Sequence, residues 1–175
     1  MWDESVRVSH NPATWHASTY ANAHAMGPDG KTRPVAAAWL KWPLRRQCDK
    51  FTYLPGGERY VGRDLNTWLG WACSPKQGDT GLFQGLLDRL FSKEQKELRW
   101  WFERWLCWPL AHPGAKLFNA AMLWSHNQGV GKSAVGDTMC SIYGKNYVSI
   151  SQRELESDFN DWAVSKQFVM IDDVS

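Results

Sequence analysis

A glycine-rich segment in the last third of the chain has the residue types and spacing that bind phosphate. It reads SHNQGVGKS over residues 125–133. Gly129 and Gly131 allow the backbone to curl until successive N–H groups point inward, and a helix beginning near Lys132 adds the positive end of its dipole. These features predict a loop that holds the phosphates of a nucleotide.

The residues after the glycines have separate expected roles. Lys132 would reach the β- and γ-phosphate oxygens as a mobile point charge, and the Ser133 hydroxyl would complete the coordination of Mg²⁺. The pattern G-x-x-x-x-G-K-[ST] has glycine where this chain has His126, so a turn that uses its glycines for geometry alone is the alternative. The residues expected to bind the nucleotide are Asn127, Gln128, Gly129, Val130, Gly131, Lys132, Ser133 and Ala134.

Two adjacent carboxylates supply the second candidate for chemistry. Asp172 and Asp173 follow the apolar run 168–171, and acids at the carboxyl end of a buried parallel strand lie at the ligand-binding edge of a sheet. We expect Asp172 to hold Mg²⁺ together with Ser133, and Asp173 to orient or deprotonate the attacking water. Lys132, Asp172 and Asp173 are thus the predicted catalytic residues. A solvated turn after an edge strand is the alternative.

The elements that must position these residues alternate between strand and helix. The order strand, helix, strand, helix, strand predicts parallel pairing through helical crossovers, and hence an α/β fold. Strands are expected at 120–124, 147–150 and 167–171, and helices at 132–143 and near 152–162, the second opened by a capping box of Ser151 and Glu154.

Two amphipathic helices are expected upstream of the loop. The first follows Thr80, and the second starts at a capping box of Ser92 and Gln95 and is expected to end at Pro109. Their expected apolar faces comprise Leu82, Phe83, Leu86, Leu87, Leu90 and Phe91 in the first helix and Leu98, Trp101, Phe102, Trp105 and Trp108 in the second.

Tryptophan is the outlier of the composition, with 12 among 175 residues. Trp100 lies on the other face of the second helix and is expected to be exposed. Trp39 and Trp42 lie near basic residues, which is as often a packed helix end as a nucleic-acid contact. Three tryptophans are expected in the core because each buries a large apolar area, with base stacking as the alternative: Trp101, Trp105 and Trp108.

The remaining composition narrows the class of protein. Hydrophobic residues make up 43% of the chain and the formal charge is +2, which fits a globular chain with a core. The apolar runs are far shorter than the roughly 20 residues that span a bilayer, and the N-terminus lacks the pattern of a secretory signal. The four cysteines form no C-x-x-C pair. We therefore expect reduced thiols in a cytoplasmic protein without a membrane partner.

Three regions are expected along the chain. Residues 1–50 are expected to form an irregular linker that contains a turn at 27–30. Residues 51–115 combine a stretch dense in glycine and proline, which predicts short strands and turns, with the two helices. Residues 116–175 are expected to form the nucleotide-binding part.

From about Phe51 to its end, the chain resembles the helicase part of phage and plasmid primase-helicases, the superfamily 3 type ATPases. The resemblance covers over half of the chain and adds several short elements, in the family's order, to the glycine-rich loop and the two acids. These elements are Phe51 through Pro55-Gly56, Leu65-Asn66-Thr67-Trp68-Leu69-Gly70, Trp105-Leu106 followed by Pro113-Gly114-Ala115-Lys116, Gly144-Lys145-Asn146-Tyr147, and Phe159-Asn160.

The resemblance implies a helical N-terminal region followed by an incomplete AAA+-like P-loop NTPase core with a parallel sheet. It implies a replicative DNA helicase of phage or mobile-element origin, in which ATP and Mg²⁺ support translocation on single-stranded DNA. A hexameric ring of identical subunits, a primase domain or protein as partner, and the cytoplasm of a bacterial host follow from the same resemblance.

The family's sensor asparagine and arginine finger would lie after Ser175, so the resemblance implies a chain truncated after the Walker B acids. An arginine finger contributes about 10³–10⁵ in rate in related enzymes, and we expect this chain to bind nucleotide weakly and turn it over poorly. Two alternatives stay open: a P-loop kinase or regulatory ATPase that does not act on DNA, and a non-catalytic interaction module.

Overall fold

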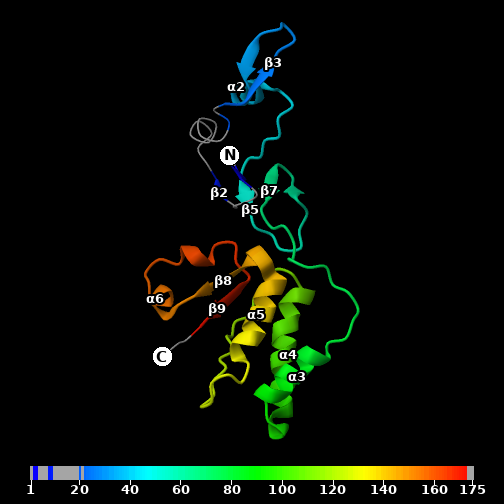
Figure 1. Ribbon diagram of the computed structural model, residues 1–175, viewed down its shortest axis with the longest axis vertical. Helices are drawn as coiled ribbons and strands as arrows, with labels where there is room; N and C mark the ends of the chain where they lie inside the picture. The colour runs from blue at the N-terminus through cyan, green and yellow to red at the C-terminus, as the bar shows by residue number, and fades with distance from the viewer. Residues whose placement is uncertain (1, 4–7, 10–19, 21, 173–175) are drawn as a thin grey trace. The chain divides into compact units, whose positions relative to one another are not determined.

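The computed structural model describes residues 2–3, 8–9, 20 and 22–172, and the chain divides into two compact units (Figure 1). The first comprises Met1–Thr52 and Tyr60–Thr67, and the second comprises Tyr53–Arg59 and Trp68–Ser175. Helices and small sheets of two or three strands are present in the described ranges, which confirms the mixed α/β class.

The first unit contains short strands and the helix α2 (Val35–Lys41). Turn signals interrupt its sequence every few residues, and the strands among its described residues are two or three residues long. The described strands are β1 (Trp2–Asp3) paired antiparallel with β2 (Val8–Ser9), β3 (His24–Met26) paired antiparallel with β4 (Thr32–Pro34), and β5 (Phe51–Thr52), β6 (Tyr60–Val61) and β7 (Asp64–Asn66), which form one sheet in the order β5-β7-β6.

The hairpin of β3 and β4 corrects the expectation that the first 50 residues are irregular. The expected turn at 27–30 is present: the Gly27 N–H donates to the Lys31 carbonyl at 2.9 Å, and Gly30 adopts a φ of 71°. A turn of this kind brings the flanking residues into register for a ladder. The turn was therefore predicted, but the hairpin that it closes was not.

The second unit contains the longer helices and the parallel strand pair. Its strands β8 and β9 pair in parallel, with Tyr147 opposite Phe168 and Ile150 opposite Ile171, as the crossover pattern predicts. The elements are α3 (Gly81–Leu90), α4 (Lys96–Ala111), α5 (Lys132–Tyr143), α6 (Gln152–Leu155), β8 (Tyr147–Ile150) and β9 (Phe168–Ile171), with 3-10 turns at Lys93–Gln95, Gly144–Asn146 and Asp161–Ala163.

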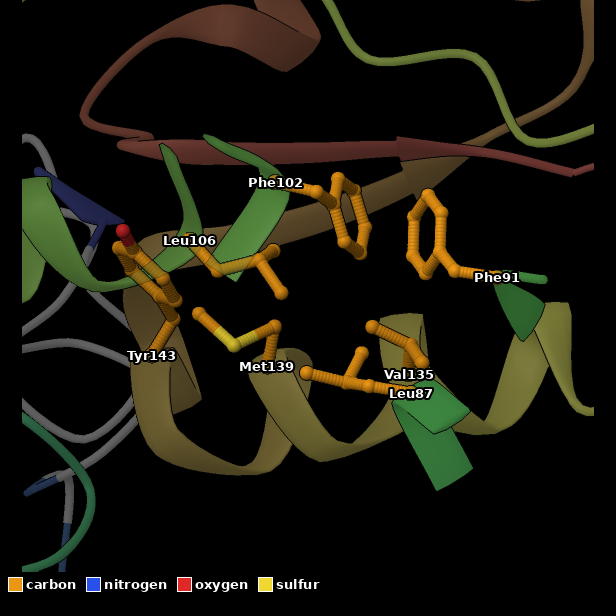
Figure 2. Packing of buried hydrophobic residues seen from close by; sticks show 7 residues of the cluster. All are labelled: Leu87, Phe91, Phe102, Leu106, Val135, Met139 and Tyr143. Atoms are coloured by element: carbon orange, nitrogen blue, oxygen red, sulfur yellow. The ribbon is translucent and has the colours of Figure 1, made fainter. Parts of the chain in front are cut away.

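The core of the second unit lies where α3, α4 and α5 meet (Figure 2). The rings of Phe91 and Phe102 approach to 5.4 Å between centroids, and fully burying one such side chain contributes about 1.5–3 kcal/mol. Each helix supplies residues spaced by about one turn, so a single stripe of each is buried. The buried cluster is Leu87, Phe91, Phe102, Leu106, Val135, Met139 and Tyr143.

Only part of the predicted apolar face of α4 is buried. Phe102 and Leu106 are buried and Trp105 packs against the core, whereas Trp101 is 39% exposed and Trp108 is 53% exposed. The expectation of a core position is therefore wrong for Trp101 and Trp108. Phe102 and Leu106, which are four residues apart, are the α4 residues that α3 and α5 bury fully. Trp100, at 57% exposure, is exposed as expected.

Two helix boundaries and one strand differ from the prediction. Both capping boxes are present, but the helix after Ser151 ends at Leu155 instead of continuing to 162. Pro109 lies inside α4, because a proline near a helix end removes one backbone bond without stopping the last turn. Residues 120–124 form no strand.

Candidate functional site

The predicted phosphate loop leads into α5 through two glycines in the left-handed region. Gly129 has a φ of 75°, and Gly131, the N-cap residue of α5, has a φ of 105°. A Cβ atom at Gly131 would also lie 2.4 Å from Cδ1 of Leu86. The backbone conformation therefore favours glycine at 131, and a Cβ there would also displace the Leu86 side chain of α3.

Lys132 is the first residue of α5 and is hydrogen-bonded back to the start of the loop. Its Nζ donates to the Ser125 hydroxyl at 2.7 Å, and that hydroxyl donates to the Asn127 carbonyl at 2.7 Å. An ammonium group has three donors, and this bond uses one. The lysine is thus held at the loop with donors left for an anion.

The first turn of α5 supplies backbone donors. The earliest helical bond that it forms runs from Val135 N–H to the Gly131 carbonyl at 3.3 Å, so the N–H groups of Lys132, Ser133 and Ala134 have no acceptor within the helix. That turn contains no acidic residue. An anion would therefore meet uncompensated donors and the positive end of the helix dipole.

The remaining predicted nucleotide contacts are placed around this turn. Ser133, Ala134, Asn127 and Gln128 are exposed, as is Gly129, while Val130 is half-buried. His126 occupies the position of the pattern's first glycine, and its ring lies 4.4 Å from that of Trp124. The imidazole thus rests against the preceding segment.

Helix α5 runs antiparallel to β9, which places Asp172 at the same end of the unit as Lys132. Close contacts order the two elements: Gly136 faces Met170, where a Cβ would lie 2.6 Å from Sδ, and the Tyr143 ring stacks on Phe168 at 5.1 Å. The start of α5 therefore lies beside the end of β9, as Figure 1 also shows. The Asp172 side chain is exposed there. Asp173 lies outside the described residues.

The oxygen ligands predicted for Mg²⁺ suit that ion, since hydroxyl and carboxylate oxygens are hard donors. The described part of the chain contains no group of three or more His, Cys, Asp or Glu side chains placed to hold a metal. Mg²⁺ is commonly held by one or two protein groups together with substrate phosphates. Ser133 and Asp172 are a donor set of that kind.

The strand expected before the loop is replaced by an extended segment without a ladder. Its side chains alternate as in a strand, with Ala121 and Leu123 packed against the core and Met122 and Trp124 at 86% and 72% exposure. An apolar alternation selects the buried face, but a strand also needs a neighbouring edge to pair with. Within the described ranges, β8 and β9 are a two-stranded sheet.

The opposite end of α5 is built around a buried asparagine that sequence reasoning missed. Asn146 is fully buried, its Nδ2 donates to the carbonyls of Gly70 and Tyr143 at 2.7 and 3.0 Å, and its Oδ1 accepts from the Tyr53 hydroxyl at 3.0 Å. The Trp68 indole donates nearby to Gln167 at 3.2 Å. A polar residue in a turn before a strand carries no sequence signal of burial.

This network joins three of the segments that carry the family resemblance. Tyr53 belongs to the first, Gly70 to the second and Asn146 to a later one, and Gly114 of another approaches Pro55, where a Cβ would lie 3.5 Å from the carbonyl oxygen. These segments lie far apart in sequence and meet at the end of α5 away from Lys132. In this chain, Tyr53, Gly70 and Asn146 form a buried hydrogen-bond network at that end of α5.

Burial raises the pKa of the Tyr143 hydroxyl at that end of α5. Tyr143 is 1% exposed, and its removal from water, with smaller effects of Cys107 and Tyr53, raises its pKa to about 12 from 10.0. At neutral pH the ring is a neutral core group. The electrostatics of the site are set instead by Lys132, Asp172 and the helix terminus.

No protein-family model matches the chain, and comparisons with curated proteins and with solved structures gave no match either. None of the helices in the described ranges is long and apolar enough to cross a membrane. The functional argument therefore rests on the residues and geometry of the loop.

Proposed function

We propose that the chain binds ATP with Mg²⁺ at residues 127–134 and belongs to the motor of a replicative helicase of phage or mobile-element origin. The observation that supports the nucleotide site most directly is the start of α5. There, two left-handed glycines, free backbone donors and Lys132 share one end of the unit with Asp172. An AAA+-like core, a hexameric ring, a primase partner and a bacterial cytoplasmic setting belong to the same proposal.

Each residue has a defined task in this proposal. The N–H groups of the loop and first helical turn donate to the phosphates, and Lys132 turns from Ser125 to the terminal phosphates. Ser133 and Asp172 hold Mg²⁺, which would neutralise charge on the phosphate oxygens. Asp173 orients or deprotonates the attacking water. Hydrolysis would be coupled to movement along single-stranded DNA.

Binding of Mg·ATP, measured by isothermal titration calorimetry, tests the nucleotide site. We expect Lys132→Ala to weaken binding by about tenfold or more, since it removes a charged hydrogen bond worth about 1.5–3 kcal/mol. The matched control is Lys76→Ala, because Lys76 is exposed and lies outside the loop. Negligible binding by the wild type would instead favour an interaction module.

A second measurement separates a DNA motor from other ATPases. We expect single-stranded DNA to change the affinity of the chain for Mg·ATP, because a motor couples its two ligands. ATP binding that depends on Lys132 but ignores DNA would favour a kinase or regulatory ATPase.

A further inference from the structure

The exposed side of α4 carries cations and aromatic rings in alternation. Every fourth residue belongs to this set and all are exposed, with Trp100 at 57% and Trp108 at 53%. Residues four apart lie one above another on a helix. We call this set the basic–aromatic ridge: Lys96, Trp100, Arg104, Trp108 and His112, the last directly after the helix.

The ridge has no part in the core. Phe102 and Leu106 face α3 and α5, and a step of two residues turns a helix by roughly 200°. Trp100 and Arg104 therefore point away from the core. Large exposed apolar side chains gathered on one face mark an interaction site more often than isolated ones do.

Contacts within the ridge hold its groups in line. The Arg104 guanidinium lies 4.1 Å from the centroid of the Trp100 ring, and the rings of Trp108 and His112 lie 4.0 Å apart. Beside them, Lys96 and Trp100 line a shallow cavity of about 440 Å³ together with Glu97 and Trp101. The ridge thus presents exposed aromatic rings next to a shallow cavity.

The charge of the ridge is positive. Two nearby carboxylates, Asp88 and Glu103, are paired with Arg99 at 2.8 and 3.3 Å. Glu94 and Glu97 are exposed carboxylates near Lys96, at the start of the helix. Permanent cations spaced between aromatic rings fit a chain of phosphates and bases.

We propose that this ridge binds single-stranded DNA, with bases stacked on Trp100 and Trp108 and phosphates at Lys96 and Arg104. Lys96 and Arg104 are eight residues apart, as are Trp100 and Trp108, so each pair is separated by about 12 Å along the helix, which is more than one nucleotide step of a single strand. Tryptophan faces accept any base, so binding would be sequence-tolerant. A second copy docking symmetrically would bring the same cations together, at an electrostatic cost.

The choice of DNA as the ligand rests on the proposed function, but DNA binding at the ridge does not require ATP. The test is fluorescence anisotropy of a labelled oligothymidine with the full chain and no ATP. We expect Trp100→Ala to weaken binding about tenfold. We expect Arg104→Ala to weaken it and to lower the slope of log K against log salt by about 0.7. Trp124→Ala and Arg153→Ala, at exposed positions outside α4, are the matched controls and should bind as the wild type does.

An abasic oligomer of the same length isolates stacking. Trp100→Ala should lose less affinity for it than for oligothymidine, because no base is present to stack, whereas Arg104→Ala should weaken the binding of both oligomers. Wild-type affinity of both ridge variants for oligothymidine would overturn the proposal. A change in oligomeric state in place of DNA affinity, measured by light scattering, would overturn it in favour of self-association. Mg·ATP binding of the ridge variants is measured in parallel, so failure here is distinguishable from failure of the nucleotide site.

Discussion

The two ends of α5 differ in burial and in hydrogen bonding. At one end, Asn146 is fully buried and hydrogen-bonds to Tyr53, Gly70 and Tyr143. At the other end, residues 126–129 are exposed and the backbone N–H groups of the first helical turn lack acceptors within the helix. The first arrangement fixes the helix against segments distant in sequence. The second leaves donors for a ligand. The contrast indicates that rigidity at the asparagine end positions an open binding end.

The largest effect is expected at the asparagine end. Asn146→Ala removes the donor to the Gly70 and Tyr143 carbonyls, each costing about 1–3 kcal/mol when unpaired, and removes one of the acceptors of the Tyr53 hydroxyl, which also bonds to Gln167 at 3.4 Å. We expect a loss of roughly 3–5 kcal/mol in the free energy of unfolding. Urea denaturation followed by circular dichroism measures it. Asn127→Ala, at the exposed loop end, should change stability by no more than about 0.5 kcal/mol. Equal effects of the two variants would contradict the contrast.

Substitutions at Gly129 and Gly131 test how strongly the exposed end of α5 is constrained. Gly131→Ala meets both a left-handed φ and Leu86, whereas a Cβ at Gly129 meets only the backbone penalty, with open space around it. We expect a loss of about 1–2 kcal/mol for Gly129→Ala and roughly 2–4 kcal/mol for Gly131→Ala. Thermal denaturation of both variants checks the order, and a larger effect at 129 would show that α3 does not constrain the loop.

A smaller effect is expected from pH at Tyr143. The folded state raises the pKa of this hydroxyl to about 12, so the folded chain holds the proton more tightly than the unfolded chain does. Its stabilising contribution is full below about pH 10 and is lost as pH rises toward 12. We expect up to roughly 2 kcal/mol of stability to disappear over this window.

Urea denaturation at a series of pH values measures this loss. Tyr143→Phe lacks the titrating group and should show a weaker decline over the same range. An identical decline in both proteins would assign the loss to other groups.

Local signals predicted most of the elements near the site. Helix α5, strand β8 and both capping boxes lie where the sequence places them, and β9 begins one residue later than expected. Helix periodicity, capping residues and apolar runs act over a few residues, so they can be read directly from the chain. The left-handed glycines belong to the same class, since a backbone requirement is written in residue type.

Other features depended on partners far away in the sequence. Residues 120–124 have the alternation of a strand, yet they find no ladder in the described part of the second unit. The burial of Asn146 required segments from residues 53, 70 and 143 to converge. The exposure of Trp108 followed from how little of α4 its neighbours cover.

The sequence alone determines the residue types at the loop and the local turns that place Lys132 at a helix start, because those depend on neighbours within one turn. Only the tertiary structure decides that Asp172 shares an end with Lys132, and that the basic–aromatic ridge faces outward. Strand pairing, burial and helix orientation depend on contacts between distant segments, and residue type does not specify which of them will meet.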